Sequence, residues 1–257
     1  MRLLLAGLAA LVFVSLAVAA APSNDDVAQA ANITSLPFAD TVSLAEATVA
    51  AGDLDCSGLD DTHTVWYRIT PQADMRLGLR TVNEEGIEVS TTVASGQPGS
   101  FTQLQCSFSQ TQGLDVTAGT SYYIQLATAG IDPGPVVDFS VVRVEPLAVE
   151  IALSKNVSLN DGAATVSGTL QCSRRTPPGS ETAVQGTLDQ GATHGWLVPV
   201  HFSTGCSKMP MRWRTTVQIL SGPAFVKGQA SLSGTGFACD AFICAEPDTE
   251  TVTAKLR

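Results

Sequence analysis

The stretch Thr64-Val65-Trp66-Tyr67-Arg68-Ile69 decides the fold of this chain. Side chains of a β-strand point alternately to opposite faces, so the stretch predicts a strand with Trp66 on one face and Tyr67 on the other. Residues 75–82 alternate long and short side chains in the same way, and turn signals such as Asp132-Pro133-Gly134 separate the strands. Repeated short strands with no helical pattern between them predict an antiparallel β-sandwich.

Strands of this kind are predicted along the whole chain. In the first half they cover 87–93, 101–108, 121–127 and 136–144, and in the second half 149–153, 164–172, 195–202, 213–220 and 224–231. Pro146 marks the passage from one group of strands to the next. We therefore predict an all-β protein with two consecutive antiparallel sandwich domains, at 21–145 and 146–257.

The first twenty residues are predicted to be a secretion signal. Met1-Arg2 gives a positive start, an apolar run follows from residue 3 to 18, and Ala17-Val18-Ala19 provides small residues for cleavage. The apolar run is short for a transmembrane anchor, which is the alternative. We expect a secreted protein with no membrane anchor after cleavage.

Charge is distributed unevenly between the two predicted domains. Residues 21–145 carry sixteen acidic residues against four arginines, whereas residues 146–257 carry eight acidic and nine basic residues. The acidic first half argues against a nucleic-acid partner, because nucleic-acid phosphates would be repelled. A solvated acidic face is the simplest interpretation of that charge.

The first half resembles a known family of secreted bacterial domains. Thr64-Val65-Trp66-Tyr67 and Thr120-Ser121-Tyr122-Tyr123-Ile124 occur in the order seen in the pre-peptidase C-terminal (PPC) domain family, around Cys56 and Cys106. The resemblance covers residues 22–145 and implies a jelly-roll-like β-sandwich. It also implies an accessory module linked to secretion, surface binding or substrate contact. No catalytic unit of the kind that carries such modules is recognised in this sequence.

Two further resemblances concern the second half. The run from Asp161 to Cys172 is similar to the start of actinobacterial immunoglobulin-like secreted domains. The close pair Cys239 and Cys244 is similar to the short disulfide loop of the neocarzinostatin family. These resemblances imply an immunoglobulin-like sandwich, and the second one raises the alternative of a small-molecule carrier.

The six cysteines predict structural disulfides. Six cysteines allow fifteen pairings. Pairing within each domain gives Cys56–Cys106 and leaves three arrangements for the other four, of which we favour Cys172–Cys206 and Cys239–Cys244. Secretion into an oxidising compartment and the lack of any C-x-x-C spacing argue against a metal or redox site.

No catalytic residue is assigned from the sequence. His63 lies beside Asp60 and Asp61, so a secreted hydrolase using this imidazole and a carboxylate is the alternative function. No G-x-S-x-G elbow accompanies the histidines, and His194 and His201 are seven residues apart, too far for a zinc pair on one strand face. Surface or strand-end positions are the ordinary interpretation of all three.

Two candidate binding sites follow from the charged residues. No other cofactor is expected, but calcium is a candidate ligand because loops rich in Asp and Asn supply the oxygens that it prefers. The oxygen-bearing residues considered are Asn24, Asp25, Asp26, Asp53 and Asp55. The second candidate is a cationic patch around the Cys172–Cys206 bridge with an exposed tryptophan among the charges. It comprises Arg174, Arg175, Lys208, Arg212, Trp213 and Arg214.

The expected function is binding rather than catalysis. A patch of cations with an aromatic side chain suits an acidic polymer or an anionic glycan of the cell envelope. The alternative for that patch is a set of individually solvated charges. We expect a secreted, non-catalytic protein that binds an extracellular or cell-surface partner.

Overall fold

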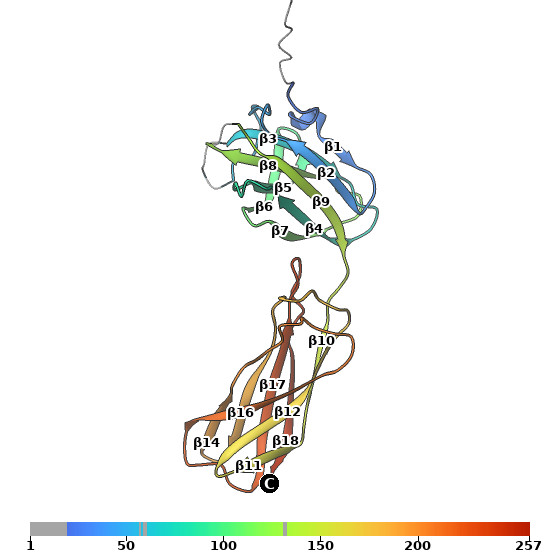
Figure 1. The fold of residues 1–257 in the computed structure, drawn as a ribbon. Helices are drawn as coiled ribbons and strands as arrows, with labels where there is room; N and C mark the ends of the chain where they lie inside the picture. The colour runs from blue at the N-terminus through green and yellow to red at the C-terminus, as the bar shows by residue number, and fades with distance from the viewer. Residues whose placement is uncertain (1–19, 57, 59–60, 131–132) are drawn as a thin grey trace, which may run out of the picture.

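The computed structural model describes residues 20–56, 58, 61–130 and 133–257. Figure 1 shows two β-sandwiches in succession, joined by a short connection after β9. The predicted signal peptide lies almost wholly outside the described residues, as does Asp60. Apart from one short 3-10 helix, Val27–Gln29, the regular elements of the described part are strands, which confirms the predicted all-β fold.

The first sandwich contains two sheets, in which all strands except β1 pair antiparallel. The first has the order β1-β3-β8-β5-β6 and the second β2-β9-β4-β7. The strands are β1 Ala31–Ile33, β2 Phe38–Ser43, β3 Asp61–Ile69, β4 Met75–Val82, β5 Ser90–Gln97, β6 Ser100–Ser107, β7 Thr111–Val116, β8 Tyr122–Ala129 and β9 Val136–Val144. Strands 2 and 9, 3 and 8, 4 and 7, and 5 and 6 pair with one another. This nested pairing is that of a long hairpin rolled into a jelly roll, with β1 added parallel to β3.

The alternation predicted for residues 64–69 is confirmed, but both of its faces are buried as far as Tyr67. Tyr67 lies between the two sheets, where its ring contacts Phe139 at 4.6 Å between centroids. Trp66 points to the outer face of β3 and is nevertheless fully buried. Phe101 stacks on its ring, and Asp53 accepts a hydrogen bond from its indole nitrogen at 3.0 Å. The segment before β3 thus covers this outer face.

The second sandwich is built from nine strands. They are β10 Val149–Leu153, β11 Asn156–Asn160, β12 Ala163–Cys172, β13 Thr182–Gln190, β14 Thr193–Leu197, β15 Val200–His201, β16 Met211–Ser221, β17 Gly228–Ala238 and β18 Asp248–Leu256. One layer is β10-β12-β16, and the other is β18-β17-β13-β14. The layers are joined at both edges, because β11 pairs with β12 and in parallel with β18, and β14 pairs with both β13 and β16. This arrangement is immunoglobulin-like, as expected.

Each sandwich has its own hydrophobic core. In the second one, Trp213, Phe225 and Leu170 are buried between the layers. Glycine is required where Phe225 packs, because a Cβ at Gly195 would lie 2.9 Å from its ring. All three predicted disulfides form: Cys56–Cys106, Cys172–Cys206 and Cys239–Cys244.

The two sandwiches touch through the loop closed by the last disulfide. Phe242, in this loop, lies on the outer face of the first sandwich against Gly78 of β4. Arg76 donates a hydrogen bond to the carbonyl oxygen of Phe242 at 3.1 Å. A Cβ at Gly113, the strand partner of Gly78, would overlap that carbonyl oxygen. In Figure 1 this loop follows β17 and reaches toward β4 and β7.

Candidate binding face on the second sandwich

The predicted cationic patch is only partly assembled. The Cys172–Cys206 bridge forms, but Arg174 turns away from the patch toward the domain junction. Its guanidinium donates to Asp240 at 2.5 Å and to the backbone oxygen of Glu145 at 3.1 Å. Burial alone would raise the pKa of Asp240. Hydrogen bonds from the Phe242 amide and from Arg174 outweigh burial and hold this pKa below its usual value. Arg174 is therefore a structural residue.

The prediction that Trp213 is an exposed aromatic side chain is wrong. Only 4 % of its surface is accessible, because it points from β16 into the core and lies over Gly168 of β12. The alternation of β16 explains the error. Trp213 and Val217 face inward, so their neighbours Arg212 and Arg214 face outward. An aromatic residue between two arginines in sequence lies on the opposite face from both.

Four of the predicted cations remain exposed. Among the described residues, none of them forms a salt bridge. These four are Arg175, Lys208, Arg212 and Arg214. Arg212 and Arg214 are two residues apart on one face of β16, which places their Cα atoms about 7 Å apart. Two like charges at this spacing repel each other, so an anion between them would be bound favourably.

The outward side chains of β16 form a continuous row, which we call the β16 strip: Arg212, Arg214, Thr216 and Gln218. Its ends are about 20 Å apart along the strand. Beside it, the three outward residues of β12 that pair with the strip in register all bear a hydroxyl group. Thr169 pairs with Arg212, Ser167 with Arg214, and Thr165 with Thr216. Guanidinium groups and hydroxyls thus lie side by side on one outer face.

Sequence reasoning missed the aromatic residue of this face, Trp196. It points outward from β14 and is the strand partner of Gln218 at the end of the β16 strip. In the next row, His194 and Asp189 form a pair with Nδ1 and Oδ1 2.8 Å apart. The stretch Thr193-His194-Gly195-Trp196-Leu197 alternates in the required way, and this pattern could have placed His194 and Trp196 on one face.

His63 lies in a position unsuited to a general base. It is buried near the start of β3, and its Nδ1 lies 2.8 Å from the carbonyl oxygen of Ala47, to which it donates. Nε2 is buried and has no hydrogen-bond partner among the residues that the structure describes. Asp61 instead accepts a hydrogen bond from Gln125. Neither imidazole nitrogen faces solvent. His201 is exposed on β15, apart from the His194–Asp189 pair.

Four of the five residues considered for calcium form side-chain hydrogen bonds within the fold. Asp53 accepts hydrogen bonds from Thr64 and Trp66, and Asp25 accepts two from Thr48. Asn24 is buried and bonds to the backbone of Trp66. Asp55 accepts one from the Gly58 amide, and Asp26 is exposed. Within the described ranges, no group of three or more His, Cys, Asp or Glu is placed to hold a metal ion.

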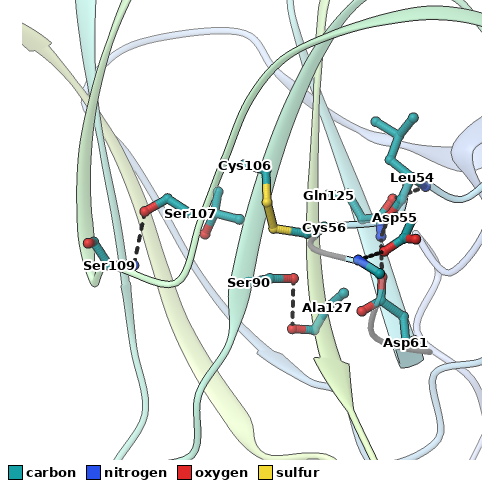
Figure 2. Close-up of a disulfide and its surroundings, with 12 residues drawn as sticks. Leu54, Asp55, Cys56, Asp61, Ser90, Cys106, Ser107, Ser109, Gln125 and Ala127 are labelled. Carbon is teal, nitrogen blue, oxygen red and sulfur yellow. Dashed lines mark hydrogen bonds between the residues drawn. A yellow bond between two sulfur atoms is a disulfide. The ribbon is translucent and has the colours of Figure 1, made fainter.

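Burial raises the pKa of Asp61 from 3.8 to about 6, and the neighbouring carboxylates of Asp55 and Asp53 add to this effect. Figure 2 shows the surroundings, in which the Gln125 side chain joins Leu54 to Asp61 beside the Cys56–Cys106 bridge. The Leu54 amide donates a hydrogen bond to Gln125 Oε1 at 2.7 Å, and Gln125 Nε2 donates one to the Leu54 carbonyl oxygen at 3.0 Å. The group is thus a structural clamp.

Comparisons with known proteins identify no family. No family model and no curated protein matches the chain, so the resemblance to PPC domains stays a prediction. Among solved structures, similarity is found to a β-glucuronidase of Ruminococcus gnavus (9% identity, TM-score 0.29, 74% of this chain and 35% of that one). A β-glucuronidase of Parabacteroides merdae gives 11% identity and a TM-score of 0.26, and the match covers 77% of this chain and 28% of that one. A putative β-galactosidase from Bacteroides fragilis gives 13% identity and a TM-score of 0.23, and the match covers 74% of this chain and 32% of that one.

The chain spans about a third of the length of these enzymes. The TM-scores are too low to indicate a shared function. In the part of the chain that the structure describes, no helix is long and apolar enough to cross a membrane.

Proposed function

We propose that this chain is a non-catalytic extracellular protein whose second sandwich binds a polyanion along the β16 strip. The observation that carries the proposal is the exposure of Arg212 and Arg214, side by side on one strand face and without an acidic partner among the described residues. Three disulfides support an extracellular location, because such bridges persist in oxidising compartments.

The chemistry of the face suits an anionic polymer. Guanidinium groups bind carboxylate, sulfate or phosphate oxygens through two parallel hydrogen bonds. The hydroxyls of Ser167 and Thr169 lie beside them and can donate to the same oxygens. The acidic first sandwich repels a polyanion, so that attraction is confined to the second sandwich.

A carrier function receives less support. The space between the two layers of the second sandwich is filled by Trp213, Phe225 and Leu170, all of which are buried. A small molecule held between the layers would have to displace these side chains. The outer face requires no such rearrangement.

Retention on a dextran sulfate column, measured as the salt concentration needed for elution, tests the proposal. The double variant Arg212→Glu/Arg214→Glu is expected to elute at the lowest salt, because it reverses both charges of the strip. The matched control Arg80→Glu/Arg143→Glu makes the same change in net charge on the first sandwich, and it is expected to elute like the unmodified protein. Equal loss in both variants would show a general charge effect and contradict the proposal.

A further inference from the structure

Trp196 is the one tryptophan of this chain that is open to solvent. The chain has three tryptophans, and the accessible fractions are 0 % for Trp66, 4 % for Trp213 and 37 % for Trp196. The ring stands on the outer face of β14, where its strand neighbours are Thr187 on β13 and Gln218 on β16. Leu220, 65 % accessible, lies at the register shift between β14 and β16.

A rim of polar groups lies beside this ring, on the neighbouring strands and in the next row. Asp189 is held by His194 at 2.8 Å and by the Thr187 hydroxyl at 3.3 Å. His194 and Asp189 are strand partners in the row next to Trp196 and Thr187. The His194 and Asp189 side chains are 58 % and 41 % accessible, so both can also contact a ligand. A sugar ring has an apolar C–H face and polar hydroxyl groups. The Trp196 ring offers an apolar surface for that face, and the carboxylate, imidazole, hydroxyl and amide groups beside it can bind the hydroxyls.

The ring is also continuous with the proposed anion site. Gln218, next to Trp196, is the last residue of the β16 strip, and Arg214 lies four residues back on the same face. That spacing is about 13 Å along the strand. A ligand that contacts both Trp196 and Arg214 therefore needs an apolar ring face with hydroxyl groups at one place and a negative charge at the other. These two places are more than one sugar unit apart.

We propose that the ligand is an acidic polysaccharide, with one pyranose ring stacked on Trp196 and acidic groups on Arg214 and Arg212. This inference rests on the proposed function and adds the class of ligand. A polyphosphate or an acidic peptide satisfies the arginines, but it offers no pyranose ring with hydroxyls for the Trp196 rim. Electrostatics alone does not distinguish these polyanions, whereas Trp196 does.

Because the other tryptophans are buried, acrylamide quenching of intrinsic fluorescence reports on Trp196 in the unmodified protein. Polygalacturonate is expected to protect the fluorescence from quenching, whereas inorganic polyphosphate is expected to bind without protecting it. An oligogalacturonate should bind and monomeric galacturonate should not, since the monomer cannot reach both Trp196 and Arg214. Equal protection by polygalacturonate and polyphosphate would overturn the inference.

Variants give an independent measurement. In calorimetric titration, Trp196→Ala should weaken polygalacturonate binding about tenfold and leave polyphosphate binding unchanged. Trp196→Phe, which keeps an aromatic ring, should restore most of the affinity, and Leu104→Ala removes an exposed apolar side chain of the first sandwich as a control. If Trp196→Ala binds polygalacturonate with unchanged affinity, the inference that the ligand is an acidic polysaccharide is refuted, while the proposed polyanion binding is retained. If the unmodified protein binds neither polymer, the proposed function itself fails.

Discussion

The raised pKa of Asp61 makes a defined prediction about stability and pH. This carboxyl has a pKa of about 6 in the folded protein, against 3.8 for an ordinary aspartate, chiefly because it is partly buried. The folded state therefore binds a proton between pH 4 and pH 6 that the unfolded chain does not bind. Asp61 thus favours folding most at low pH, and this contribution is lost as the pH rises through about 6.

The perturbation is Asp61→Asn, which removes the titration and keeps an oxygen to accept the hydrogen bond from Gln125. The change from 3.8 to about 6 corresponds to at most about 3 kcal/mol. Asp61 is partly exposed, and solvent screening reduces the expected effect to about 1 kcal/mol. At pH 7 the variant should be more stable by that amount, a rise in Tm of about 4 °C. At pH 4 the gain should vanish.

Scanning calorimetry at pH 4, 5, 6 and 7 measures the effect, and the difference between variant and unmodified protein isolates Asp61 from the other carboxyls. Asp26→Asn is the matched control, because Asp26 is exposed and has no side-chain hydrogen bond among the described residues. The control should leave the pH profile unchanged. A variant that is destabilised at pH 7, or equally stabilised at pH 4 and pH 7, would refute the reasoning.

Two further predictions concern the second sandwich and the junction. Replacing both Cys172 and Cys206 by Ser should lower the free energy of unfolding by about 3–4 kcal/mol, measured by urea denaturation, because the bridge closes a long loop with a sequence separation of 34; a loss below 1 kcal/mol would contradict this. Gly113→Ala should displace the Phe242 carbonyl and thereby speed proteolytic cleavage in the connection 145–148. Phe242→Ala should speed the same cleavage because it removes the side chain that packs on Gly78. An unchanged cleavage rate in both variants would show that this contact does not fix the junction.

The fold could be predicted from the sequence because alternation and turn residues are local signals. The strands Val136–Val144 and Val149–Leu153 have the predicted bounds. Strand β13, Thr182–Gln190, was not predicted, because its small and polar residues show little contrast between faces. It forms a hairpin with β14, and its place as a central strand comes from long-range pairing with β17, which the local sequence does not encode.

The site was harder to predict than the fold. Alternation within β16 separates Trp213 from its arginine neighbours, and closeness in sequence was mistaken for a shared surface. Arg174 leaves the patch because Asp240, sixty-six residues later in the chain, binds it at the domain junction. Trp196 joins the face because β14 pairs with β16, and this pairing between distant segments cannot be read from either strand alone.

The central claim is that the outer face formed by β14 and β16 binds an acidic polysaccharide. Hydroxyl-radical footprinting of the unmodified full chain, with and without polygalacturonate, tests this claim at the level of single side chains. Trp196 and Leu220 are expected to lose much of their oxidation when the polymer is present, relative to the exposed reference residues Leu104 and Val136 of the first sandwich. Equal changes at all four residues, or protection of Leu104 and Val136 alone, would contradict the claim.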